Sequence, residues 1–233
     1  MISVIIPTYN EENYIEKSLK RLSNQTISRN KYEIIVVDGG SKDKTVKIAK
    51  KYADKIVIQK SPWVSGARND AVKVSKYDLI ATTDADVLVP KNWLEKIIEH
   101  FSDKRVVAVC GVDEPRERNL KSVLTFKLIR KIINGATKLN YYCLGSTNTA
   151  FRKHVFSKIG GYKLLPHSED AYLSYQMRES GKIVYDKNLK VRVSTRRFEK
   201  YGYLKVLWIW FKGDLLLFFG KNLKDINYFR QQY

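Results

Sequence analysis

Two aspartates separated by one residue, Asp84 and Asp86, are the side chains whose types and spacing best suit chemistry. The preceding residues 77–83 are β-prone and mostly apolar, and Pro90 follows, so the pair is expected where a buried strand ends in a loop. Carboxylates two residues apart on an extended chain point to the same side. Such oxygen ligands suit Mg²⁺ or Mn²⁺, which keeps open positions for water and phosphate oxygens. The pattern is also common in solvated loops, so the rest of the chain must decide.

The first half of the chain alternates between strand and helix patterns. Strand patterns cover residues 2–6, 32–37, 55–59, 77–83 and 105–110, and helix patterns cover residues 11–25, 43–51, 64–74 and 93–101. This alternation predicts an α/β fold with a parallel sheet and helices on both faces. Asn10 is expected to cap the first helix. Because ligands bind at the carboxyl ends of such strands, residues 7–10, 38–41 and 84–86 are expected at one edge.

The second half is less regular. Apolar residues recur at helical spacing over residues 120–133 with lysine and arginine between them, which predicts a basic amphipathic helix. A short strand is expected at 148–152, a helix at 167–179, and strands at 183–186 and 190–193. Residues 203–219 are strongly apolar and aromatic, but Lys205, Lys212 and Asp214 interrupt them, so a membrane span is not expected.

The length of 233 residues and the hydrophobic content of 44% suit one globular unit with one substantial core. The N-terminal residues begin with a strand pattern and lack the basic and apolar regions of a signal peptide, which favours a cytoplasmic location. Cys110 and Cys143 are too few for a disulfide framework or a zinc site, so both are expected to be small buried hydrophobes.

The net charge of +19 is concentrated in the second half. Up to Pro115 the chain has 19 basic and 16 acidic residues, against 24 and 8 from Arg116 onward. A strongly basic half favours an anionic partner, which is nucleic acid, anionic lipid or a phosphorylated substrate. For any single lysine, a solubilising surface is the simpler interpretation.

Several short motifs occur in a specific order along the chain. They are SVIIPTYNEE at 3–12, IIVVDGGS at 34–41, SGARN at 65–69, TDAD at 83–86, and GGY at 160–162 followed by SED at 168–170. This set resembles family 2 glycosyltransferases of the GT-A fold. The resemblance implies a single GT-A domain with a mainly parallel, nucleotide-binding sheet. Residues 1–115 would then form the donor half, residues 116–198 the acceptor half, and residues 199–233 a basic, aromatic C-terminal helical tail.

The resemblance implies that the loop after the first strand and the aspartate after the second hold the nucleotide base. The residues concerned are Pro7, Thr8, Tyr9, Glu11 and Asp38. An aromatic and apolar wall can stack a base, and a carboxylate can accept a hydrogen bond from a ring N–H. Glu11 also suits the first turn of a helix on electrostatic grounds. Asp38 directly follows an apolar run, where a carboxylate is costly unless it has a partner.

Arg68 resembles the basic residue that the family places near the donor. A guanidinium there can bind ribose or diphosphate oxygens, although an ordinary helix-surface arginine is an alternative. Asp84 is expected to contact ribose or metal, and Asp86 to bind the divalent ion, Mn²⁺ or Mg²⁺, that bridges the diphosphate. Such an ion stabilises the charge that develops on the leaving nucleoside diphosphate.

Asp170 corresponds to the family's general base, a role that implies inversion at the anomeric carbon. The alternative is that Glu169 and Asp170 form an acidic pair that only stabilises the start of a helix. If the acceptor is an ionised phosphate, no base is required and Asp170 positions substrate instead. His167 and Glu169 are adjacent to Asp170 and are candidate contacts for the acceptor or a phosphate.

Three further residues are assigned to the acceptor or to phosphate. Asn148 lies in a segment that resembles the family's acceptor-side strand and is the expected sugar contact. Arg196 and Arg197 stand where some members carry a histidine metal ligand, which puts a third protein ligand in doubt. Adjacent arginines after a strand can hold a diphosphate or an acceptor phosphate, or they can be surface charge.

Together these features predict an inverting, metal-dependent transferase. It would move a sugar from a UDP- or GDP-linked donor to a hydroxyl or phosphate acceptor, which is either a glycan or lipid-linked. The basic helix and the aromatic tail favour peripheral contact with the inner face of the cell membrane, although both segments could instead pack on the domain or form a homodimer.

Two other classes of function compete with the transferase. A nucleotidyltransferase usually needs a glycine-rich phosphate loop near the N-terminus, which residues 7–11 do not supply. A basic nucleic-acid-binding protein would carry a recognisable motif, and none is present, so nucleic acid is not an expected partner.

Overall fold

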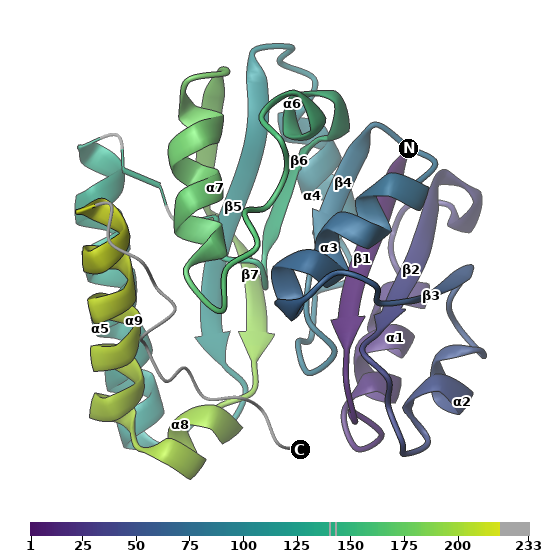
Figure 1. Cartoon of the computed structure of the whole chain (residues 1–233), viewed down its shortest axis with the longest axis horizontal. Helices are drawn as coiled ribbons and strands as arrows, with labels where there is room; N and C mark the ends of the chain where they lie inside the picture. The colour runs from purple at the N-terminus through teal and green to yellow at the C-terminus, as the bar shows by residue number, and fades with distance from the viewer. Residues whose placement is uncertain (140, 143, 220–233) are drawn as a thin grey trace.

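The computed structural model describes residues 1–139, 141–142 and 144–219. The expectation for Cys143 and the part of the expected C-terminal tail at 220–233 lie outside the described residues. A seven-stranded sheet with the order β3-β2-β1-β4-β6-β5-β7 runs through the molecule and has helices on both faces (Figure 1). The strands are β1 (Ile2–Thr8), β2 (Tyr32–Asp38), β3 (Lys55–Ile58), β4 (Leu79–Thr82), β5 (Val106–Pro115), β6 (Thr149–Arg152) and β7 (Lys182–Val193). β6 is antiparallel to β4 and β5, and the other pairs are parallel. The predicted α/β class with a mainly parallel sheet is therefore confirmed.

The helices divide between the two faces of the sheet and one end of it. They are α1 (Ile15–Ser23), α2 (Thr45–Ala49), α3 (Trp63–Val74), α4 (Trp93–His100), α5 (Leu120–Lys138), α6 (Lys153–Lys158), α7 (Glu169–Arg178), α8 (Arg196–Tyr201) and α9 (Tyr203–Phe218), with a 3₁₀ turn at Arg29–Lys31. Residues of α1, α2 and α4 share one core cluster, and residues of α3, α6 and α7 share another. Among the described residues, no helix is both long and apolar enough to cross a membrane.

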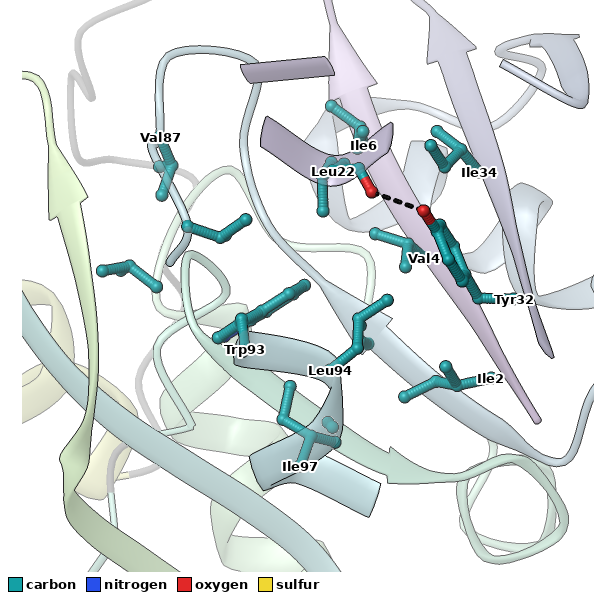
Figure 2. Close-up of a cluster of buried hydrophobic side chains, with 14 of the residues drawn as sticks. Ile2, Val4, Ile6, Leu22, Tyr32, Ile34, Val87, Trp93, Leu94 and Ile97 are labelled. Carbon is teal, nitrogen blue, oxygen red and sulfur yellow. Dashed lines mark hydrogen bonds between the residues drawn. The ribbon is translucent and has the colours of Figure 1, made fainter. Parts of the chain in front are cut away.

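Consecutive residues of the central strands enter different cores because side chains alternate across a sheet. Val4 and Ile6 lie in one cluster, and Ile5 between them lies in the other. Figure 2 shows the first cluster, where Trp93 from α4 is completely buried. The Tyr32 hydroxyl in this cluster donates to the Leu22 carbonyl at 2.8 Å, which gives the buried phenol its partner.

The carboxyl ends of the parallel strands meet at one edge, as expected for this topology. Thr8 at the end of β1 is paired in register with Asp38 at the end of β2. Asp84 follows β4 by two residues, and Asp113 lies near the end of β5. Because β6 runs the other way, the residues that precede it reach the same edge.

Several element boundaries differ from those expected. The first helix begins at Ile15, and Asn10 is not its cap: Asn10 has a φ of 52° and its side chain accepts from the Lys42 amide at 2.8 Å. The two short strands expected at 183–186 and 190–193 form one strand, β7, whose register against β5 shifts twice. Irregularities of this kind interrupt the side-chain alternation by which a strand is recognised.

The helices at the end of the sheet are held by a small aromatic core of their own. Phe126 of α5, Phe198 of α8 and Val206 of α9 are buried together. The Phe198 ring lies 5.6 Å from the Phe126 ring and 5.4 Å from the Trp210 ring, centre to centre. α5 and α9 consequently lie together beyond β7, at the opposite end of the molecule from β3 (Figure 1).

Candidate active site

Arg68 connects two parts of the site that are distant in sequence. Its side chain is only 3% exposed, although it belongs to α3. The guanidinium donates to Asp84 at 2.8 Å, to Glu169 at 3.0 Å and to the Thr82 hydroxyl at 3.2 Å. A planar group with several donors suits such simultaneous contacts. Arg68 is therefore not an ordinary helix-surface arginine, and it links the end of β4 to the start of α7.

Asp84 and Asp86 lie in a turn in which the Val87 amide donates to the Asp84 carbonyl at 3.2 Å. Asp84 remains partly exposed, whereas Asp86 accepts from Arg196 at 3.0 Å. Burial raises the pKa of Asp86, and the neighbouring arginine opposes that rise. The two aspartates therefore face different arginines.

Arg196 reaches this turn because the loop after Asp86 is joined to the end of β7. Leu88 and Arg192 exchange backbone hydrogen bonds of 2.8 and 3.0 Å, which places the start of α8 beside the turn. The Arg196 guanidinium donates to Glu11 as well as to Asp86, and it lies 4.4 Å from the centre of the Tyr14 ring. Arg196 is thus part of the site rather than isolated surface charge.

Arg197, the next residue, contributes positive charge near Asp86. Its field lowers the pKa of that carboxyl, against the larger effect of burial. The two arginines expected to face phosphate are therefore both close to the acidic turn. Whether either one contacts a phosphate stays a prediction.

Glu11 is buried and lies ahead of α1, so the expected place in the first helical turn is wrong. Its amide donates to the Thr45 hydroxyl at 2.7 Å, and its carboxylate faces Arg196. Burial raises the pKa of Glu11 to about 7, although Arg196 acts in the opposite direction. Glu11 therefore belongs to the same acidic cluster as Asp86.

The other residues assigned to the base lie at the ends of β1 and β2. Asp38 finds the partners that its burial requires in the backbone, since it accepts from the amides of Gly40 and Ser41, both at 3.0 Å. Pro7 and Thr8 close β1, and the Tyr9 ring that follows is 36% exposed. An exposed ring beside a polar strand end can stack a base.

Glu169 and Asp170 are the first two residues of α7. The preceding Ser168 has a φ of 58°, which turns the chain sharply into the helix. Asp170 accepts from the Ala171 amide at 2.9 Å. Burial raises the pKa of both carboxyls, and the proximity of the two negative charges adds to the rise at Glu169. A carboxylate with a raised pKa is suited to accept a proton near neutral pH.

His167 is buried beneath another helix rather than directed at solvent. Its Nδ1 lies 3.0 Å from the Ser168 hydroxyl, and its ring packs against Gly213 of α9. Burial lowers the pKa of His167, because charge on the ring would be poorly solvated. Its position supports the loop that precedes Asp170, and an acceptor contact stays a prediction.

Asn148 has a different place from the one expected. Its side chain is 2% exposed and accepts from the Trp93 indole at 2.8 Å. Its amide donates to the Leu189 carbonyl at 2.8 Å. The side chain thus ties α4 to β7 inside the core, and the expected sugar contact is not supported.

Sequence reasoning missed Asp113, which lies at the same edge of the sheet. It accepts from the Thr147 hydroxyl at 2.7 Å. Burial raises the pKa of Asp113 to about 7, and the charges of Asp84 and Asp170 contribute to the rise. The sequence did point to Asp113, because this residue follows an apolar run as Asp38 does. It was missed because the strand was expected to end at Cys110.

The carboxylates of Asp84 and Asp86 fit a hard divalent cation in chemical type. Among the residues that the structure describes, no group of three or more His, Cys, Asp or Glu side chains is placed to hold a metal ion. Mg²⁺ and Mn²⁺ need few protein ligands when a substrate supplies phosphate oxygens. The site therefore fits an ion that would be shared with a diphosphate.

Comparisons with known proteins agree with this geometry. Residues 3–160 match the profile of glycosyl transferase family 2. Glycosyltransferase AglE of Haloferax volcanii is 36% identical over 116 residues, which are 47% of this chain and 38% of AglE. The O-antigen chain rhamnosyltransferase RfbN of Salmonella typhimurium is 31% identical over 212 residues, 83% of this chain and 66% of RfbN. The chain therefore spans less than two thirds of the length of either relative.

Solved structures share the fold at low sequence identity. The mannosyltransferase PcManGT from Pyrobaculum calidifontis, in complex with GDP-Man and Mn²⁺, has a TM-score of 0.74 at 22% identity, over 94% of this chain and 63% of its own. Glucosyl-3-phosphoglycerate synthase from Mycobacterium tuberculosis, in complex with Mn²⁺, UDP-glucose and phosphoglyceric acid, has a TM-score of 0.70 at 16% identity, over 95% and 80%. The matched motifs and the shared sheet together place the chain in glycosyl transferase family 2, with the GT-A fold.

Proposed function

We propose that the chain transfers a sugar from a nucleoside diphosphate donor to an acceptor hydroxyl, with inversion at the anomeric carbon. The observation that carries the proposal is the bridge made by Arg68, which joins Asp84 on the donor side to the start of α7, where Asp170 lies. A donor-binding turn and a carboxylate with a raised pKa are thereby held in one arrangement. This arrangement favours a transferase over the nucleotidyltransferase and nucleic-acid-binding alternatives.

The donor is a UDP- or GDP-linked sugar. Tyr9 and Asp38 provide a ring and a carboxylate for the base, and Arg196 and Arg197 provide positive charge for the diphosphate. The similarity to structures that hold GDP-Man or UDP-glucose supports this class of donor.

Asp84 and Asp86 would hold the divalent ion, Mn²⁺ or Mg²⁺. When bound, such an ion supplies Lewis-acid stabilisation of the departing diphosphate. Arg196 pairs with one carboxylate oxygen of Asp86, so its positive charge would lie near a diphosphate held at this turn. The Mn²⁺ in both solved structures supports the assignment.

Asp170 would accept the proton of the attacking hydroxyl. The acceptor oxygen forms its bond to the sugar as the bond to the diphosphate breaks on the opposite face, which inverts the anomeric centre. The proton passes to Asp170 and the electron pair of the broken bond leaves with the diphosphate.

A hydroxyl acceptor is favoured over an ionised phosphate by the charges around Asp170. Glu169, Asp113 and Asp84 all lie near this carboxyl, as their mutual effects on pKa indicate. An anionic nucleophile would be repelled by such neighbours. The acceptor would therefore be a glycan hydroxyl, borne on a lipid at the inner face of the cell membrane, where the basic second half meets anionic headgroups.

The proposal is tested by calorimetric titration of UDP, GDP and dTDP, with and without Mn²⁺. We expect UDP or GDP to bind at least about tenfold more tightly with Mn²⁺, a difference of about 1.4 kcal/mol. Asp86→Asn should abolish the metal dependence, and Glu179→Gln, a change at a side chain that is 73% exposed, should leave it intact. Absence of metal-dependent nucleotide binding would overturn the donor site.

A further inference from the structure

α5 exposes an apolar stripe to solvent. Leu120, Leu124, Leu128 and Ile132 follow one another at intervals of four residues and are between 51% and 75% exposed. At about 100° per residue, these side chains share one side of the helix. The buried Phe126 lies on the opposite side and fixes the helix to the body of the protein. The stripe therefore faces away from the sheet.

α9 repeats the arrangement with aromatic side chains. Leu204, Trp208, Phe211 and Leu215 are between 43% and 84% exposed and recur at intervals of three or four residues. The buried residues Val206 and Gly213 occupy the opposite side of the helix. Leaving eight large apolar side chains on two helices in water is costly, since the cost grows with the apolar area that stays exposed.

Lysines flank both stripes. Lys127 and Lys131 on α5 and Lys212 on α9 are exposed, and the helical repeat places them beside the apolar residues. Exposed Trp and Phe side chains next to lysines match the headgroup zone of an anionic bilayer. A second copy of a chain with a net charge of +19 would bring like charges together, which disfavours a dimer through this surface.

The inner side of α9 contacts the loop that precedes the candidate base. A Cβ atom added at Gly213 would lie 2.2 Å from His167 Cε1 and 2.8 Å from the Ser168 hydroxyl oxygen. A side chain at this position would force His167 to shift, and His167 is itself buried. α9 thus has one side on the loop before Asp170 and the other in solvent.

We infer that the two lysine-flanked stripes of α5 and α9 form a docking face for an anionic lipid surface, and that docking holds α9 against the loop at residues 166–168. Transfer is then faster at the membrane than in solution. The inference rests on the proposed function, because that function gives Asp170 its role as the base.

Binding is tested without any substrate, by flotation with vesicles of phosphatidylcholine alone or mixed with phosphatidylglycerol. The wild-type chain is expected to float with the mixed vesicles. The double variant Leu124→Ser, Phe211→Ser should bind about 100-fold more weakly, because each exposed apolar side chain loses its burial in the bilayer. A matched double variant on the opposite end of the molecule, Ile58→Ser with Val74→Ser, replaces residues that are 72% and 43% exposed and should bind like wild type.

Coupling is tested by the release of nucleoside diphosphate from the bound donor, with water as the acceptor. Mixed vesicles should raise this rate several-fold for the wild type but not for Leu124→Ser, Phe211→Ser, whose rate without vesicles should equal that of the wild type. Gly213→Ala should float normally and lose the stimulation.

Two results would overturn the inference. One is equal flotation of the wild type and the stripe variant, and the other is a wild-type dimer in size-exclusion chromatography that the stripe variant abolishes. If flotation succeeds but no donor is cleaved under any condition, the proposed transfer function fails and the docking face stands.

Discussion

Individual side chains at the edge of the sheet divide into those that hold the site together and those that face the substrates. Arg68 is buried and fully occupied by Asp84, Glu169 and Thr82, so it positions its partners. Arg196 is 22% exposed and pairs with carboxylates on the donor side. The two arginines therefore have different roles, because Arg68 is buried among its partners and Arg196 is partly exposed.

Asp113 and Asp170 should give distinguishable defects when each is changed to asparagine. Asp170→Asn removes the base, so donor hydrolysis and sugar transfer should both fall by about 10²- to 10⁴-fold. If Asp113, which lies near Asp170, also holds the acceptor, Asp113→Asn should leave donor hydrolysis nearly unchanged and raise KM for a sugar acceptor by about tenfold, the usual effect of losing one hydrogen bond. The measurement is nucleotide release with water and with a panel of methyl glycosides. Equal losses in both reactions for Asp113→Asn would assign it to catalysis instead.

At the scale of elements, local patterns were sufficient for the donor half. Each strand from β1 to β4 carries an apolar run that ends at a polar residue, so Asp38 and Asp84 were placed at the correct edge from sequence. The contact between Arg196 and Asp86 was not predictable, because it depends on the backbone bridge between Leu88 and Arg192. The repeat of apolar residues along the sequence does not indicate which distant segments pair with each other.

Asn148 shows a second limit of reasoning from motifs. The resemblance pointed to a sugar contact, whereas the side chain satisfies the Trp93 indole and the Leu189 carbonyl in the core. In the sequence, an asparagine that satisfies buried polar groups cannot be distinguished from an asparagine that binds a ligand. Only the packing of α4 against β7 distinguishes them.

Asn148→Ala should consequently reduce stability rather than substrate affinity. The change leaves a buried N–H and a buried carbonyl without their partner, which costs about 1–3 kcal/mol for each unsatisfied group. Urea unfolding should show this loss, while donor KM below the unfolding midpoint stays within about twofold. Asn188→Ala, at an exposed position of β7, is the matched control. A change in acceptor KM without a change in stability would restore the original assignment.

For the whole molecule, two electrostatic effects act on stability in opposite directions as pH changes. The net charge of +19 grows as carboxylates gain protons, so general repulsion destabilises the fold toward acid pH. Buried carboxyls near the active site act the other way. The pKa values of Glu11 and Asp113 are both raised to about 7, from ordinary values of 4.5 and 3.8. Salt screens the surface effect strongly and the effect of the buried groups much less.

In about 0.3 M salt, which shortens the screening length, the free energy of unfolding should therefore be larger near pH 5.5 than near pH 7.5. Between the two pKa values of each carboxyl, the folded state binds more protons than the unfolded state, so stability falls as pH rises through about 7. His167 opposes the trend, because its lowered pKa stabilises the fold as pH rises. Carboxyls with a lowered pKa, such as Glu33 and Asp70, act only at more acid pH. Urea unfolding without nucleotide at the two pH values measures how the free energy of unfolding changes with pH.

The double variant Glu11→Gln, Asp113→Asn identifies the source of that slope. Both substitutions keep the side-chain shape and remove the titrating group, so the variant should lose part of the decrease between the two pH values and should be more stable than the wild type at the higher one. The raised pKa values of Asp86, Glu169 and Asp170 account for the decrease that stays. A wild-type protein that is more stable near pH 7.5, or a variant with an unchanged slope, would show that these two carboxyls are not titrating as buried groups. The burial that raises these pKa values also favours the binding of positively charged groups, since a cation that pairs with the carboxylates offsets the cost of burying their charge.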